Sequence, residues 1–282
     1  CVLVKIMNKM NRIAIQGGTG SFHEQAARLF YGNHIEVLPC NTFEELFTSM
    51  NEGKAPGAVM AIENSIAGDL LPNYALLHKY KKQVKGEIIL PIHQNLMALP
   101  GQRIEDITEV RSHYMAIAQT REFFKAYPSI LLTELEDTAW SAKEIADKKL
   151  SRTGTIASSY AAQLYHLEIL RENIETNRQN YTRFLVLDDR IQVKETDINK
   201  VSLCFTLVNE PGSLARVLSS LSAGNLNVTK IQTLPITGKP WQYLFYLALE
   251  FKSRGQYQTT LQTVRPYLQE IYIMGEYKTY TI

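Results

Sequence analysis

The chain has few cysteines, no long apolar segment and no excess of charge of either sign. Its three cysteines lie far apart in 282 residues and form no CxxC pattern. Neither a disulfide framework nor a zinc site is therefore expected, and a reducing cytoplasm is the natural compartment. No apolar run has the length needed to span a bilayer. Lys+Arg at 30 against Asp+Glu at 28 creates no broad field for nucleic acid or an anionic membrane, so a small anion must be captured by local groups.

The first ten residues, CVLVKIMNKM, are too short for a signal peptide and lack a small-residue cleavage pattern. We interpret them as an upstream extension and leave them out of the fold prediction. From residue 11 onward, short alternating or apolar segments take turns with amphipathic ones, which predicts an α/β domain with a mostly parallel sheet. The expected strands are 11–16, 58–65, 109–113, 130–135, 153–158 and 182–187, and the expected helices are 23–31, 46–50, 69–80, 114–127, 138–149 and 159–167.

An extended crossing at 87–100 separates two sets of these units, since Pro91 argues against a helix there. This arrangement predicts two lobes with a cleft between them. The charged segment 188–200 reads as a linker. Beyond it the order becomes strand, helix, strand, strand, helix, strand, which is the ferredoxin-like βαββαβ pattern. The chain therefore divides near 194–200 into a larger domain and a smaller one.

Two stretches place polar groups where an expected strand ends, the usual ligand-binding edge of an α/β sheet. Gly17–Phe22 is a glycine turn that opens a helix, and its N–H groups together with the helix dipole favour an anion. Capping of a structural helix explains these residues equally well, and the spacing is not a dinucleotide fingerprint. Ala61–Gly68 supplies a carboxylate, an amide and a hydroxyl, although a turn also uses Asn and Ser for its own hydrogen bonds.

Two further stretches are weaker when taken singly. Ser112-His113-Tyr114 lies where a strand enters a helix, with Gln119 two turns into that helix. A histidine in such a place is more often a structural cap than a catalyst. Thr182-Arg183-Phe184 begins a returning strand, where Thr is an ordinary β-former and Arg an ordinary ion-pair residue. Together, the four stretches supply hydroxyls, amides, one Arg and helix N-termini, but no nucleophile–base pair and no cluster of metal ligands. This set favours hydrogen-bond donation to an anionic ligand over hydrolysis.

In this order, the four stretches resemble the motifs of the prephenate dehydratase family over nearly the whole chain. The family's Gly-rich turn, Thr/Ser-Phe and Glu-x-Ala-Ala helix are similar to GGTGSFHEQAA, and its Pro-Ile-Glu-Asn-Ser stretch is similar to AIENS. Its Ser-His-Pro-Gln-Ala-Leu-Ala-Gln segment looks like SHYMAIAQ, and its Asn-x-Thr-Arg-Phe motif stands intact at 180–184. The chain departs from the family at Gly18, Ala61, Tyr114 and Met115, where Pro, Pro, Pro and Gln are usual.

The resemblance implies a two-lobed, periplasmic-binding-protein-like (type II) catalytic domain over 11–190 and an ACT regulatory domain over 200–282. The implied reaction is the decarboxylating dehydration of prephenate to phenylpyruvate in L-phenylalanine biosynthesis, without cofactor or metal. The family assigns assistance of the leaving hydroxyl to the Thr of Thr-Arg-Phe, hence Thr182, with Arg183 and Phe184 beside it. The implied substrate-binding residues are Thr19, Ser21, Phe22, Glu63, Asn64, Ser65, Gly68, Ser112, His113, Gln119 and Thr138.

The C-terminal part resembles an ACT domain, because NEPGSLARVL is similar to its loop and first helix. L-Phenylalanine is the implied effector, and pairing of ACT domains implies a homodimer or homotetramer. Where the family has Glu-Ser-Arg, the chain has Gln232, Thr233 and Leu234. The implied effector-binding residues are Asn209, Pro211, Gly212, Ser213 and Leu214.

Two other functions fit the same sequence. Arogenate dehydratase performs the same elimination on the amino analogue of prephenate, and the sequence does not separate the two substrates. A non-catalytic amino-acid sensor would join a binding-protein-like module to an ACT domain, and the intact Thr182-Arg183-Phe184 argues against it.

Overall fold

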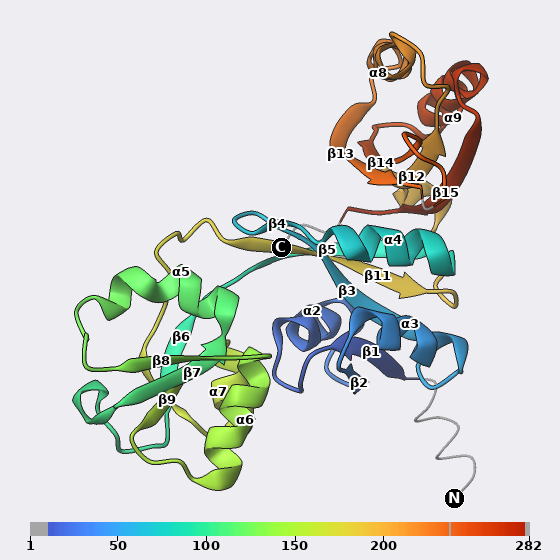
Figure 1. The fold of residues 1–282 in the computed structure, drawn as a ribbon. Helices are drawn as coiled ribbons and strands as arrows, with labels where there is room; N and C mark the ends of the chain where they lie inside the picture. The colour runs from blue at the N-terminus through green and yellow to red at the C-terminus, as the bar shows by residue number, and fades with distance from the viewer. Residues whose placement is uncertain (1–10, 237, 280–282) are drawn as a thin grey trace, which may run out of the picture. The chain divides into compact units, whose positions relative to one another are not determined.

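The computed structural model describes residues 11–236 and 238–279 (Figure 1). Tertiary contacts divide the chain into two units. The first unit runs to Asp69 and resumes over Ile89–Phe184, and the second consists of Leu70–Ile88 and the chain from Leu185 onward. The expected domains at 11–190 and 200–282 remain a prediction. No helix in the described residues is long and apolar enough to cross a membrane.

The first sheet forms one lobe and has the strand order β2-β1-β3-β11-β5. Its central strands are apolar runs buried on both faces, as parallel sheets covered by helices require. β1 pairs in parallel with β2 and β3, and β3 turns back to pair with the short β4. The elements are β1 (Arg12–Gln16), α2 (Phe22–Tyr31), β2 (Glu36–Cys40), α3 (Phe43–Asn51), β3 (Gly57–Asn64), β4 (Gly68–Asp69), β5 (Val84–Pro91) and β11 (Tyr181–Asp188).

The second lobe lies within the first unit and has the strand order β10-β6-β9-β7-β8. β7 runs parallel to β8 and β9, whereas β6 runs antiparallel to β9 and β10. Alternate residues of β6 face opposite sides: Leu96 packs with α5, and Met97 packs with α6 and α7. The elements are β6 (Asn95–Ala98), η1 (Ile104–Asp106), β7 (Glu109–His113), α5 (Tyr114–Phe124), β8 (Leu131–Leu135), α6 (Thr138–Lys148), β9 (Thr153–Ala157), α7 (Ser159–Tyr165) and β10 (Glu168–Arg171).

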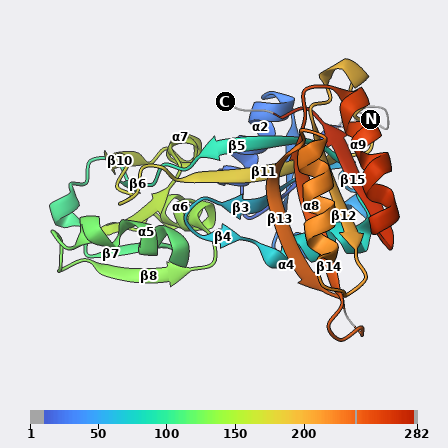
Figure 2. The ribbon, with the colours of Figure 1, turned by 90° about the horizontal axis from the view of Figure 1, so that it is seen from above.

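The second unit contains an antiparallel sheet of order β13-β14-β12-β15, which confirms the predicted βαββαβ fold. Figures 1 and 2 show α8 and α9 side by side, and both contribute to one core with the sheet. The other face of the sheet receives α4, whose Tyr74 ring meets that of Tyr246 edge-on at 4.6 Å. The elements are α4 (Leu71–Tyr80), η2 (Glu195–Asp197), β12 (Lys200–Thr206), α8 (Ser213–Ala223), β13 (Asn227–Pro235), β14 (Tyr243–Glu250), α9 (Arg254–Val264), η3 (Arg265–Tyr267) and β15 (Glu270–Tyr277).

β2, β10 and α9 are among the elements that differ from the sequence prediction. β2 was not expected because Pro39 interrupts its apolar pattern, but β2 is an edge strand, where a missing N–H is tolerated. β10 was likewise not expected. α9 starts at Arg254, and Gly255 in its first turn conceals that start in the sequence.

Candidate active site

The Gly-rich turn after β1 is shaped by two glycines with positive φ, Gly17 at 87° and Gly20 at 93°. Ser21 then caps α2, with its Oγ accepting from the N–H of Glu24 at 3.4 Å. The carboxylate of Glu24 accepts from the N–H of Gly20 at 2.6 Å and pairs with Arg28. Oγ of Ser21 therefore serves as an acceptor within the turn.

The same turn packs against the second lobe. The hydroxyl of Tyr165 donates to the carbonyl of Thr19 at 2.5 Å, and that of Ser158 donates to the carbonyl of Gly20 at 2.9 Å. A Cβ on Gly18 would lie 2.2 Å from the indole of Trp140. This contact gives a physical reason for glycine at this position, because Trp140 occupies the space of a side chain.

Asn64, the last residue of β3, joins three segments of the site. Its Oδ1 accepts from the N–H groups of Ile66 and Ala67, at 3.0 and 2.8 Å. These two contacts fix the orientation of the amide, so that Nδ2 faces β11. From there Nδ2 donates to Oγ1 of Thr182 at 3.0 Å and to Oδ1 of Asn180 at 2.8 Å.

The neighbours of Asn64 hold the turn and the strand together. The Oγ of Ser65 donates to the carbonyl of Gln179 at 3.0 Å and accepts from the N–H of Tyr181 at 2.9 Å. Nη1 of Arg183 lies 3.9 Å from a carboxylate oxygen of Glu63. The side chain of Arg183 is mostly buried, so this ion pair is shielded from water on one side.

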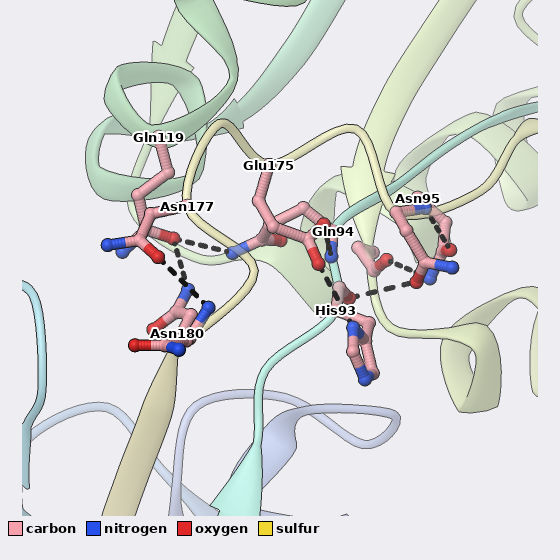
Figure 3. A network of polar contacts seen from close by, with 10 residues as sticks. His93, Gln94, Asn95, Gln119, Glu175, Asn177 and Asn180 are labelled. Carbon is pink, nitrogen blue, oxygen red and sulfur yellow. Dashed lines mark hydrogen bonds and ion pairs between the residues drawn. The ribbon is translucent and has the colours of Figure 1, made fainter.

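Gln119 extends this group of amides from α5. Its Oε1 accepts from Nδ2 of Asn180 at 3.0 Å and from Nε2 of Gln94 at 3.1 Å (Figure 3). The structure therefore brings together Asn64, Gln119 and Thr182, which the sequence analysis had selected from three separate stretches. Asn180 and Gln94 complete the group.

The Ser112-His113 stretch has mainly structural contacts. Ser112 is fully buried, and its hydroxyl donates to the carbonyl of Ile156 at 2.6 Å. Nδ1 of His113 accepts from the N–H of Met115 and caps α5, and desolvation lowers the pKa of the His113 imidazole. Tyr114, at the helix start where the family usually has Pro, is half-exposed and stacks at a tilt against His113.

Beside His113, an open hollow of about 970 Å³ reaches along α6 and includes Asp137 and Trp140 in its lining. Asp137 caps α6 through the N–H of Trp140, and Thr138 follows as the first helical residue. Burial raises the pKa of the Asp137 carboxyl, and hydrogen bonds from backbone N–H groups, including that of Gly18, partly offset this effect. Neither Asn64 nor Thr182 lines this hollow.

Phe184 and His23 form an apolar support below the motif. The two rings meet edge-on at 5.0 Å, and Phe43 lies on the other side of His23 at 5.6 Å. Nε2 of His23 accepts from the N–H of Ala61 at 3.2 Å. Desolvation lowers the pKa of His23 to about 3, so this imidazole is neutral at pH 7 and acts as an acceptor.

Comparison with known proteins identifies the family. Residues 13–192 match the family model described as prephenate dehydratase. The chain belongs to the prephenate dehydratase family. The bifunctional chorismate mutase/prephenate dehydratase of Aquifex aeolicus is 35% identical over 275 residues, which cover 96% of this chain and 74% of that protein. The chloroplastic arogenate dehydratase 5 of Arabidopsis thaliana is 34% identical over 94% of this chain and 67% of its own length.

Solved structures agree on the fold of the prephenate dehydratase family. The prephenate dehydratase of Arthrobacter aurescens in complex with L-Phe has a TM-score of 0.84 at 22% identity, covering 95% of this chain and 89% of that one. A protein described as GqqA, a novel type of quorum quenching acylase, has a TM-score of 0.85 at 26% identity, covering 95% and 98%. Membership of the prephenate dehydratase family makes the chain a carbon–oxygen lyase.

The site residues predicted from the family motifs fall into three groups. One group surrounds Thr182, a second lies at the Gly-rich turn and the start of α2, and a third lies where α5 and α6 of the second lobe begin. Gln94 and Asp137 were missed, because a single Gln in an extended segment and a single Asp before a helix carry no family-independent pattern. The first group is Glu63, Asn64, Ser65, Gly68, Gln119, Thr182, Arg183 and Phe184, the second is Thr19, Ser21 and Phe22, and the third is Ser112, His113 and Thr138.

Proposed function

We propose that the chain converts prephenate to phenylpyruvate. The ring carboxylate leaves as carbon dioxide, its bonding electrons enter the ring, and the ring C–O bond breaks. The departing oxygen takes up one proton and leaves as water, so prephenate plus one proton gives phenylpyruvate, carbon dioxide and water. Aromatisation drives the reaction. The protein needs only to assist the departing oxygen and to hold the two carboxylates.

The contact between Asn64 and Thr182 carries this proposal. Because Oδ1 of Asn64 is occupied by two N–H groups, Nδ2 is the donor and Oγ1 of Thr182 is the acceptor. The hydroxyl proton of Thr182 is thereby left to donate elsewhere, and within 11–236 and 238–279 it has no acceptor. A preorganised donor of this kind stabilises charge on a leaving oxygen. Since a threonine hydroxyl is a weak acid, stabilisation of the leaving group rather than full proton transfer is its role.

For the carboxylates, we propose Gln119 as the principal donor. Arg183 already faces Glu63, and the hydroxyl of Ser112 donates to the carbonyl of Ile156. Nε2 of Gln119 points away from its two neighbours and has no hydrogen-bond partner in the described part of the chain (Figure 3). An N–H donor that is already oriented binds a carboxylate through a charge-assisted hydrogen bond.

Acyl transfer, suggested by the description of GqqA, finds less support. Amide hydrolysis needs a nucleophile within hydrogen-bond reach of a base. In the described residues, Ser65 bonds to Gln179 and Tyr181, and the side chains of His23 and His113 accept from backbone N–H groups. These contacts pair no serine with a histidine.

The decisive experiment compares prephenate and arogenate as substrates of the purified protein, with a chelator present and absent. We expect turnover with either, a higher kcat/KM for prephenate, and no effect of the chelator. Turnover of arogenate but not of prephenate would make the protein an arogenate dehydratase. Absence of turnover with both compounds would favour a non-catalytic amino-acid sensor.

For the second unit, we propose L-phenylalanine as effector, as bound by the Arthrobacter aurescens relative. A pocket of about 180 Å³ includes Asn209, Ser213 and Leu214 together with Trp241, Tyr243 and Phe245 in its lining. Gly212, at φ 81°, starts α8 without a side-chain cap, which leaves first-turn N–H groups for a carboxylate. The aromatic rings offer a surface for phenyl. Pro211 precedes this glycine in the loop.

We also propose that the protein is a homodimer or homotetramer in the cytoplasm, where the free thiols of Cys40 and Cys204 stay reduced.

A further inference from the structure

Two donors meet a single oxygen at Gln119. Nε2 of Gln94 and Nδ2 of Asn180 both donate to Oε1 of Gln119 (Figure 3). If the side-chain amide of Gln119 were flipped by half a turn, its Nε2 would face the two N–H groups. Gln94 and Asn180 would then each lose the acceptor of their hydrogen bond. Leaving a buried donor without a partner costs about 1–3 kcal/mol. The pair of donors therefore selects the orientation in which Nε2 of Gln119 points away from them.

Gln94 is itself held firmly. Its side chain is 4% exposed, its N–H donates to Oε2 of Glu175 at 2.9 Å, and its carbonyl accepts from the N–H of Ile174 at 2.8 Å. Oε1 of Glu175, also buried, lies 3.0 Å from Nδ1 of His93. These contacts join the two segments that cross between the lobes. They also fix the backbone from which the Gln94 side chain reaches Gln119.

We infer that Gln94 is a positioning residue for substrate binding, because it makes Gln119 present Nε2 to a substrate carboxylate. The inference rests on the proposed function. Gln94 does not contact the substrate in this account, and its effect passes through one amide. A purely structural Gln94 would instead only join the crossing segments.

The substitution Gln94→Glu tests this difference. When protonated, the introduced carboxylic acid still donates to Oε1 of Gln119. When ionised, it can only accept, which draws Nε2 of Gln119 toward it and withdraws that donor from the substrate. Glu175, which accepts from the N–H of residue 94, and its partner His93 are the titratable groups in contact with this segment. Burial raises the pKa of the introduced acid above about 4.3.

The measured quantity is the ratio of KM in Gln94→Glu to KM in the wild type at each pH. We expect a ratio near one at low pH that rises to roughly ten- to hundredfold at high pH, the cost of losing one hydrogen bond to a charged group. Because the ratio is taken at equal pH, substrate ionisation cancels. kcat should change less than KM, because the contact between Asn64 and Thr182 remains.

Gln102→Glu is the matched control. Gln102 is partly buried in the same unit, and its amide bonds only to the backbone of Leu99 and Arg152. Its ratio should stay near one at every pH. A pH-independent ratio for Gln94→Glu would overturn the inference while leaving the proposed function intact, whereas a wild type without turnover would overturn the function itself.

If Gln94→Glu does not fold, as judged by circular dichroism, Gln94→Met carries the test in two backgrounds. In the wild-type background it should raise KM about fivefold, equivalent to one hydrogen bond of about 1 kcal/mol. In a Gln119→Glu background it should leave KM unchanged, because no amide remains to be oriented. Equal effects in both backgrounds, or none in the wild type, would contradict the inference.

Discussion

Nδ2 of Asn64 lies 3.0 Å from Oγ1 of Thr182, a contact between residues 118 positions apart in the sequence. The contact determines which way the threonine hydroxyl donates, because an oxygen that accepts from an amide keeps its own proton for another acceptor. The catalytic role that we propose for Thr182 therefore depends on the chemical identity of residue 64.

Asn64→Asp should lower kcat roughly 10²–10³-fold, the range for loss of one preorganised donor. The introduced carboxylate still accepts from the N–H groups of Ile66 and Ala67. It also accepts a hydrogen bond from the Thr182 hydroxyl, which is then no longer available to the leaving oxygen. KM should rise as well, because the carboxylate also meets Oδ1 of Asn180, whose Nδ2 orients Gln119. Asn177→Asp is the control, since Oδ1 of Asn177 only accepts from the N–H of Gln179, which a carboxylate also does. Similar steady-state constants for both variants would contradict the assigned direction of the hydrogen bond.

Protonation of His23 should lower the free energy of unfolding when the pH falls below neutral. Its pKa drops from 6.5 to about 3 in the folded chain, so the unfolded chain binds the extra proton. The contribution of His23 to the free energy of unfolding is complete above pH 6.5 and is lost as the pH falls toward 3. Within this range the equilibrium constant of folding changes roughly tenfold per pH unit. His23→Gln keeps an acceptor for Ala61 but does not titrate. Urea unfolding at pH 7 and pH 5.5 should show a smaller loss for this variant than for the wild type. An equal loss would remove His23 from the acid response.

A buried ion pair should make the second unit sensitive to single substitutions. Nζ of Lys200 lies 2.7 Å from Glu87, with both side chains at most 5% exposed, and 3.1 Å from Glu250. Lys200→Met should destabilise this unit by about 3–5 kcal/mol, because the Glu87 carboxylate loses its cation. Adding Glu87→Gln should recover part of the loss. Lys54→Met, at an exposed pair that water screens, should change the stability little. Chemical denaturation would contradict the account if the Lys200 and Lys54 variants behaved alike.

Feedback control has two steps that can be measured separately, the binding of phenylalanine and its effect on the affinity for prephenate. We propose a backbone-based site in the loop at 209–214, so we expect phenylalanine to bind. Gln232 and Leu234 replace a charged pair of the family, and in this structure the Gln232 amide donates only to the adjacent Thr233 carbonyl. Coupling to prephenate should therefore fall below the about 1–3 kcal/mol typical of strong allostery. Calorimetry with phenylalanine and inhibition curves would test the two steps. Steep inhibition at micromolar phenylalanine would contradict weak transmission, and absence of binding would contradict the loop site.

Local patterns were sufficient for most of the fold. Strands with alternating apolar residues, and capped helices such as the one at Ser21, can be predicted from residues that are adjacent in the sequence. Membership of α4 in the second unit was not predictable, because it depends on packing between Tyr74 and Tyr246, far apart in the chain. β2 was hidden by Pro39, since its acceptability depends on an edge position that only the sheet reveals.

The site was predictable in parts and not in its connections. The motifs selected Asn64, Gln119 and Thr182 as single residues, but their hydrogen bonds depend on the pairing of distant segments. Gln94 and Glu175 stand in no motif used here, and their importance comes from burial and from the amide they orient. The internal contacts of Ser21 and Ser112 were equally invisible in the motifs, since Oγ of Ser21 accepts from the N–H of Glu24 and the hydroxyl of Ser112 donates to the carbonyl of Ile156.

The most direct test compares Thr182→Ala with Thr182→Ser in prephenate turnover. The alanine variant should lose roughly 10²–10³-fold in kcat with little change in KM, as expected when one preorganised donor is removed. The serine variant should retain much of the activity, because its hydroxyl can still accept from Asn64 and donate to the leaving oxygen. Near-wild-type kcat in both variants would contradict the assignment and place the donor elsewhere.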